Sequence, residues 1–232
     1  MADKNVITEG IEYYWKGNYT ASLSFFLSLS ADSGADPVEV AYYIGLCYAK
    51  LERYDDALLY LEQVVTSSAE DEKDETLLNR VLQCRYLLAV IYCMSGRKKL
   101  ADYELNKLLE TGYRKASVYA SLAYIAWEER QVDKCLKYYE DALIEDENNT
   151  TALNGMGYVL ACENRELSRA LVYCKKALEN APQSAACNDS LGWVYYKMGL
   201  LAEAKKYIGQ ARQLDDRNKI IEDHFYEVEN AV

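Results

Sequence analysis

The sequence predicts an all-α fold: about six helix-turn-helix repeats in one array, followed by a capping helix. The first observation is a small residue that recurs at Gly10, Gly45, Ala89, Ala123, Gly157 and Gly192. The intervals between them are 35, 44, 34, 34 and 35 residues, so all but one keep the same period. The second is that both prolines, Pro37 and Pro182, fall at expected repeat ends, where a helix must stop. Such self-similarity is typical of stacked repeats.

The clearest evidence lies between Leu153 and Ala211, where one pattern occurs twice. The later copy contains Gly192, Tyr195, Gly199, Ala204, Ile208 and Ala211. The earlier copy contains Gly157, Leu160, Ala170, Cys174, Ala177 and Pro182, with one extra residue in its turn. This pattern resembles the tetratricopeptide repeat (TPR), a unit of 34 residues whose small residues let two helices approach closely. The resemblance implies a right-handed superhelical solenoid.

The period places the repeats along the whole chain. We expect repeats at about 3–36, 38–71, 82–115, 116–149, 150–184 and 185–218, forming a single array over 1–232. The segment 219–232 is expected to be a capping helix with Ile221, Phe225 and Val228 on one face. The long interval contains about ten additional residues with an acidic run. Since apolar residues continue there at helical spacing, we expect an elongated first helix in repeat three, starting near Lys73.

Two repeats depart from the pattern. In repeat one, Ser22 and Leu29 replace the small alanines, as a terminal repeat permits. In repeat four the turn carries Arg130 where other repeats have glycine.

Composition narrows the function classes. Half of the 232 residues are apolar, and the net charge is −11, which argues against nucleic acid or an anionic membrane surface as the main partner. The chain starts without a secretory signal, and no apolar run approaches the roughly 18 residues of a membrane span. We therefore expect a cytoplasmic protein without membrane insertion. The seven cysteines are interpreted as small buried residues in a reducing compartment rather than a disulfide framework or a zinc site.

The resemblance also implies a concave groove lined by the first helix of each repeat. Tyrosine and tryptophan offer large contact area with a polar tip, which suits peptide binding. The groove positions that we single out as partner-binding are Tyr42, Tyr43, Tyr86, Tyr124, Trp127, Asn154, Tyr158, Trp193, Tyr196 and Lys197. Alternatively, any one of these tyrosines is buried between adjacent repeats instead of contacting a partner. The cluster from Tyr124 to Tyr196 favours binding, because three neighbouring repeats contribute to it.

Two specific chemistries are not indicated. The family's carboxylate clamp for a chaperone C-terminus needs basic or amide side chains on successive repeats. This chain has Asn154 and Lys197 but Tyr124 and Tyr158 at other groove positions, so no such connection is predicted. No phosphate loop, nucleophile motif or metal motif occurs, and we predict no catalytic, cofactor-binding or metal-binding residues and no cofactor. The single histidine, His224, is expected to be partly exposed on the surface.

The sequence therefore predicts a non-catalytic adaptor or scaffold that binds a peptide or helix of a partner protein in the concave groove. The alternative is a self-assembling structural protein that acts through homo-oligomer contacts. An enzyme with an unrecognised site is a third hypothesis. The segments NGMGYVLACENRE and NDSLGWVYYKMG are similar to bacterial proteins of the TPR family.

Overall fold

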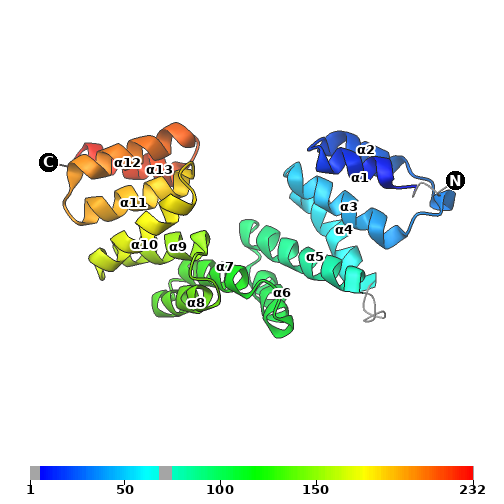
Figure 1. The fold of residues 1–232 in the computed structure, drawn as a ribbon, viewed down its shortest axis with the longest axis horizontal. Helices are drawn as coiled ribbons and strands as arrows, with labels where there is room; N and C mark the ends of the chain where they lie inside the picture. Colours follow the sequence, from blue (N-terminus) through cyan, green and yellow to red (C-terminus); the bar gives the residue numbers. More distant parts are fainter. Residues whose placement is uncertain (1–5, 68–74, 232) are drawn as a thin grey trace. The chain divides into compact units, whose positions relative to one another are not determined.

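A computed structural model describes residues 6–67 and 75–231, and within these ranges every regular element is helical. The described part contains thirteen α-helices, one short 3₁₀ helix and no strand (Figure 1). This confirms the predicted all-α fold. The chain divides into two compact units, Met1–Tyr113 and Arg114–Val232, which are taken in turn.

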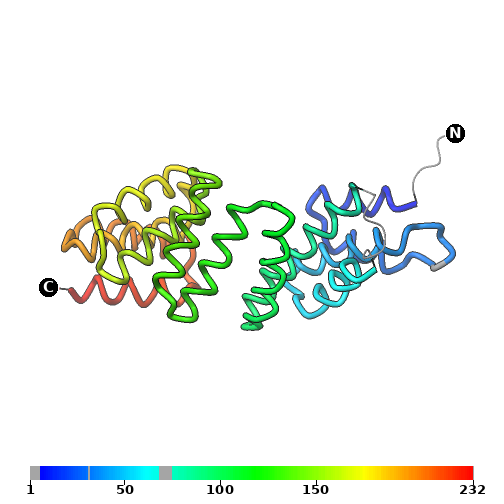
Figure 2. The backbone as a smooth tube through the Cα atoms, turned by 90° about the horizontal axis from the view of Figure 1, so that it is seen from below, coloured from blue at the N-terminus to red at the C-terminus, as the bar shows by residue number. Residues whose placement is uncertain are grey.

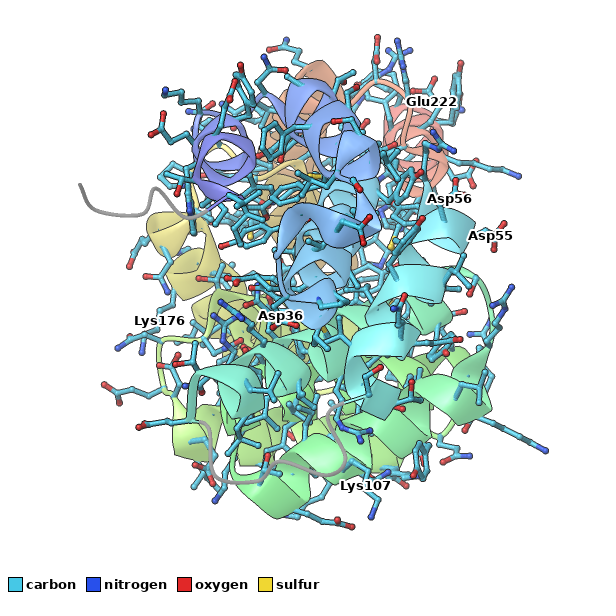
Figure 3. The ribbon with its side chains drawn as sticks, turned by 90° about the vertical axis from the view of Figure 1, so that its right-hand side faces the viewer. Asp36, Asp55, Asp56, Lys107, Lys176 and Glu222 are labelled. Atoms are coloured by element: carbon cyan, nitrogen blue, oxygen red, sulfur yellow. The ribbon has the colours of Figure 1, made fainter. Side chains whose placement is uncertain are left out.

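The N-terminal unit consists of three helical hairpins. Its helices are α1 (Thr8–Trp15), α2 (Tyr19–Ser28), α3 (Pro37–Lys50), α4 (Tyr54–Ser67), α5 (Glu75–Met94) and α6 (Lys98–Thr111), with a 3₁₀ turn at Ala31–Ser33. Asp36, labelled in Figure 3, caps α3 by accepting a hydrogen bond from the backbone N–H of Val38 at 2.9 Å. Pro37 then takes the first helical position, where its missing N–H costs nothing.

The C-terminal unit consists of three further hairpins and one last helix. Its helices are α7 (Lys115–Glu128), α8 (Val132–Glu145), α9 (Thr150–Cys162), α10 (Leu167–Asn180), α11 (Ala185–Lys197), α12 (Leu201–Leu214) and α13 (Lys219–Glu229). Each first helix packs against its own second helix, and α7, α9, α11 and α13 also contact one another in succession. These four helices thus form one layer of the unit.

The recurring small residue allows close packing within a hairpin. A Cβ added at Gly192 would lie 2.5 Å from Cγ1 of Ile208 and 2.9 Å from its backbone nitrogen. One added at Gly157 would lie 2.9 Å from the carbonyl oxygen of Ala170. A side chain at either glycine would press on a neighbouring helix, which explains why glycine stands at these two positions.

The turn inside each hairpin requires a left-handed residue. In three hairpins the left-handed residue is a glycine: Gly17, Gly96 or Gly199, with φ between 73° and 76°. Three hairpins place another residue there, with φ values of 59° at Glu52, 60° at Arg130 and 53° at Asn164. The Arg130 turn therefore keeps the same backbone shape without glycine, at the cost of strain.

Ser22 explains the departure of the first repeat. Its side chain is fully buried, and its hydroxyl donates a hydrogen bond to the carbonyl oxygen of Gly10 at 2.8 Å. Because this polar group has a partner, a serine serves as the small residue between α1 and α2.

Helix α5 has 20 residues, against 13 or 14 for the other helices from α3 to α12, so the elongated helix is confirmed. Its expected start at Lys73 and most of the acidic run lie outside the described residues. By length and composition α5 could cross a membrane, so the expectation that no run approaches this size was wrong. Its arginines Arg80 and Arg85 pair with Glu39 and Glu104, and it packs against α4 and α6. Such contacts are those of a helix in a globular unit.

The terminal helix α13 packs as predicted against α12 and α11, and Figure 2 shows it in red beside them. Ile221 and Val228 are buried and Phe225 is half-buried, which confirms the predicted face. Glu222, labelled in Figure 3, accepts hydrogen bonds from Nε and Nη2 of Arg212 at 2.7 and 3.0 Å. Apolar contacts and this bidentate ion pair therefore help to attach the helix.

Candidate functional site

The predicted groove positions divide between the two units. Tyr42, Tyr43 and Tyr86 lie in the N-terminal unit, and the seven others lie in the C-terminal unit. The two groups differ in exposure and are considered separately.

In the N-terminal unit, Tyr42 and Tyr43 are core residues. Only 9% of Tyr43 is exposed, and its ring stacks on Phe26 with centroids 5.3 Å apart. The hydroxyl of Tyr42 donates a hydrogen bond to Oε1 of Gln83 at 2.7 Å. Burial raises the pKa of both tyrosines. A partner would meet little of either ring, so we leave both out of the candidate site; Tyr86 is half-buried on α5.

In the C-terminal unit the aromatic positions form a continuous series across the layer of first helices. The ring centroids of Trp127 and Tyr158 are 6.2 Å apart, and those of Trp193 and Tyr196 are 5.1 Å apart. Between these pairs lies His224, 6.0 Å from Tyr158 and 3.9 Å from Trp193. The series therefore runs from α7 through α9 and α13 to α11.

Exposure changes along the series. Tyr124 is 49% exposed on α7, whereas Trp193 is only 6% exposed on α11. Trp127, Tyr158 and Tyr196 are half-buried. Tyr124 and Trp127 are three residues apart on one helix and so share a face. The accessible part of the series lies at α7, and its buried part lies under α13.

Two cations lie over this aromatic series. The guanidinium carbon of Arg130 is 5.9 Å from the ring centroid of Trp127. Nζ of Lys197 is 4.4 Å from the ring of Trp193 and 5.4 Å from that of Tyr196. Both interactions place positive charge at the C-terminal ends of first helices, beside the rings.

Asn154 on α9 brings an unsatisfied acceptor to the same layer. Its Oδ1 is buried and accepts no hydrogen bond from the described residues. A buried acceptor without a partner is costly, and a donor that reaches it recovers that cost. Asn154 is therefore suited to accept an N–H group.

His224 corrects the sequence prediction. The residue expected to be partly exposed is 8% exposed, and its Nδ1 lies 3.0 and 2.9 Å from Oδ1 and Oδ2 of Asp189. Its ring stacks on Trp193 with an interplanar angle of 16°. The sequence contained a signal for this position. His224 lies three residues after Ile221 and four before Val228, on the apolar face of the helix.

The described residues offer little for metal or thiol chemistry. No group of three or more histidine, cysteine, aspartate or glutamate side chains there could hold a metal ion. All seven cysteines are free, and five of them are buried as predicted: Cys47, Cys84, Cys135, Cys174 and Cys187. Burial raises the pKa of Cys84 and Cys135 to about 12, so these thiols stay protonated at neutral pH.

Comparisons with known proteins identify related sequences. One family model described as tetratricopeptide repeat matches residues 7–72 and 121–185, and a second of the same description matches residues 185–218. TPR repeat-containing protein PA4667 of Pseudomonas aeruginosa is 35% identical over 83 residues, 36% of this chain and 14% of that protein. Photosystem I assembly protein Ycf3 of Synechococcus sp. is 32% identical over 93 residues, 39% of this chain and 53% of that protein. Both matches cover less than two thirds of the relative's own length.

Solved structures show the same fold. The Cut9-Hcn1 structure matches 96% of this chain and 42% of its own chain, with a TM-score of 0.73 and 13% identity. MamA matches 78% of this chain and 93% of its own, with a TM-score of 0.54 and 18% identity. YrrB matches 90% of this chain and 97% of its own, with a TM-score of 0.50 and 17% identity.

Proposed function

Because the chain belongs to the tetratricopeptide repeat family, we propose that it is a non-catalytic adaptor that binds a segment of a partner protein. The binding surface in this proposal is the first-helix face of the C-terminal unit, defined by Tyr124, Trp127, Asn154 and Tyr158. The observation that carries it is the aromatic series, which is continuous and remains accessible at α7. Aromatic side chains of this kind supply contact area at low entropic cost.

The composition of this face favours a particular type of segment. Its rings offer apolar contact, and Oδ1 of Asn154 can accept a backbone or side-chain N–H. The net charge of −11 favours a neutral or basic partner over an acidic one. In this proposal the partner inserts apolar side chains between the rings and donates one hydrogen bond to Asn154. In this proposal the binding takes place in the cytoplasm.

Two related proteins support a role in protein binding. The YrrB structure is described as a TPR protein with an unusual peptide-binding site, and Ycf3 is named as an assembly protein of photosystem I. These properties belong to those proteins. For this chain they support protein recognition in general, and the aromatic face supplies the specific location.

The experiment compares three forms of the full chain as bait in a lysate of the source cells. The face variant carries Tyr124→Ala and Trp127→Ala. The control variant carries Ile144→Ala and Val172→Ala, which remove exposed apolar side chains from the second helices α8 and α10. Circular dichroism first establishes that all three baits are folded.

We expect one partner to be retained by the native chain and the control variant and lost by the face variant. Mass spectrometry identifies that partner. Equal retention by the face variant would contradict the proposed surface. Loss by the control variant alone would move the binding surface to the second helices. A mass in solution that rises with concentration and survives the face substitutions would favour self-assembly instead.

A further inference from the structure

We propose that Asp189, Trp193 and Tyr158 form a cage for a cationic side chain, and that His224 is the internal occupant of this cage. A lysine or arginine side chain of the partner segment replaces His224 there. The partner step rests on the proposed function, whereas the cage itself does not.

Asp189 requires a donor. Its side chain is buried in the interior of α11. Among the described residues, Nδ1 of His224 lies within hydrogen-bond distance of both carboxylate oxygens, at 3.0 and 2.9 Å. A carboxylate buried without a partner is strongly unfavourable, because it loses hydration without compensation. An imidazolium, ammonium or guanidinium group supplies both the N–H donor and the positive charge that the buried carboxylate needs.

The two rings add the same preference. Trp193 stacks on His224 with centroids 3.9 Å apart, and Tyr158 approaches it at 6.0 Å with an angle of 45°. The faces of aromatic rings carry negative potential and attract cations. A carboxylate and two aromatic rings together form a site for a cation rather than a general apolar cavity.

The occupant is attached by a short terminal helix. Helix α13 has 11 residues, fewer than the about 12–15 at which an isolated helix becomes even marginally stable, so its order depends on docking. Within the described residues its main helix contacts are with α12 and α11. In a repeat array each unit is stabilised mainly by its neighbours, so a short helix that packs on one hairpin can detach while the other hairpins remain folded.

The cage is also continuous with the proposed binding surface. Tyr158 belongs to both, because its ring centroid lies 6.2 Å from that of Trp127 and 6.0 Å from that of His224. A partner segment lying along Tyr124 and Trp127 therefore reaches the cage at Tyr158. The chemistry assigned to this partner is an apolar segment that carries a basic side chain.

The first experiment is chemical rescue of the full-length His224→Ala variant. Removing the imidazole leaves a cavity beside Asp189 that free imidazole can enter. Thermal unfolding is measured at about pH 6, where free imidazole is largely protonated. Pyrazole, which has similar size but stays neutral, is the matched control ligand.

We expect imidazole to raise the melting temperature of His224→Ala by more than pyrazole does, with little effect of either on the native chain. In the double variant Asp189→Asn with His224→Ala, the advantage of imidazole disappears. Equal effects of imidazole and pyrazole on His224→Ala would overturn the cation cage. An unchanged advantage in the double variant would exclude Asp189 as its cause.

A second pair of variants keeps the test decisive if His224→Ala does not fold. His224→Lys restores a cation and His224→Met a neutral chain of similar length. The cage predicts a melting temperature near that of the native chain for His224→Lys and a loss of several degrees for His224→Met. The reverse order would overturn it. None of these measurements uses the partner, so a failed lysate experiment leaves their outcome unaffected.

Discussion

Both units place aromatic side chains on their first helices, yet they use them differently. In the N-terminal unit Tyr43 is buried against Phe26 and Tyr14, and it belongs to the core. In the C-terminal unit Tyr124 is half exposed and leads into the series through Trp127. A tyrosine on a first helix is thus a core residue in one unit and a surface residue in the other.

What distinguishes the units is the group that covers the rings. In the N-terminal unit a long side chain from the next hairpin, Gln83, reaches Tyr42, and Arg80 lies 5.7 Å from its ring centroid. In the C-terminal unit α13 covers Trp193 but not Tyr124. In the C-terminal unit the last helix therefore separates the buried Trp193 from the exposed Tyr124 of the proposed binding surface.

The largest expected effect tests this contrast directly. Tyr43→Ala should lower the free energy of unfolding of its unit by about 3 kcal/mol, because it deletes a buried aromatic ring. Tyr124→Ala should change stability by no more than about 0.5 kcal/mol, because its ring is half exposed. Urea denaturation of both variants measures the difference. Similar losses in the two variants would show that Tyr124 is also core.

The second prediction compares the small positions of the two units. Gly192→Ala should destabilise by about 2 kcal/mol, because its Cβ would press on the backbone of α12. Gly45→Ala should cost less, because its Cβ would meet mainly the side chain of Leu61, with Cδ2 at 2.8 Å and the nearest backbone atom at 3.4 Å. Denaturation midpoints of the two variants give the order. A larger loss at Gly45 would contradict the packing explanation.

The third prediction concerns alkaline pH and affects both units alike. Burial raises the pKa of Cys84 and Cys135 from 9.0 to about 12 in the folded chain. Below pH 9 the thiols are protonated in both the folded and the unfolded chain, so the free energy of unfolding does not depend on them. As the pH rises from 9 to 12, the unfolded chain releases these protons first, and the folded chain loses stability. We expect each thiol to lower the free energy of unfolding by about 1 kcal/mol at pH 10. Cysteine-to-alanine variants should show a smaller decline, and an identical decline would assign it to other groups.

The smallest expected effect is a stabilisation in the turns. Glu52→Gly should raise the stability of the N-terminal unit by about 1 kcal/mol, since glycine removes the strain of a left-handed glutamate. Asn164→Gly in the C-terminal unit is the matched control and should change little, because asparagine tolerates this conformation. Thermal melts of both variants test the pair. Destabilisation by Glu52→Gly would show that its side chain, rather than its backbone, matters.

The repeat period allowed most of the fold to be predicted. Small residues such as Gly192 and Gly157 mark close contacts between the two helices of a hairpin, so their spacing directly reports the hairpins. The apolar face of α13 was equally readable from Ile221, Phe225 and Val228. These features depend on local spacing and on the packing of sequence neighbours.

Side-chain exposure could be predicted less well, because it depends on what covers each residue. Tyr43 and Tyr124 both lie within two residues of the small residue of a first helix, yet Tyr43 is buried and Tyr124 is half exposed. His224 was assigned to the surface because its partner, Asp189, lies 35 residues away, and a polar residue was read as a solvent-facing one. Spacing shows which face of a helix is apolar but not which distant carboxylate that face meets.

The most direct measurement is hydroxyl-radical footprinting of the free chain and of its complex with the partner identified above. Mass spectrometry then reports oxidation at each aromatic side chain. We predict that Tyr124 and Trp127 are oxidised in the free chain and protected in the complex, while Tyr43 stays unreactive in both. Unchanged oxidation of Tyr124 and Trp127 in the complex, with protection appearing at Ile144 or Val172 instead, would contradict the proposed binding face.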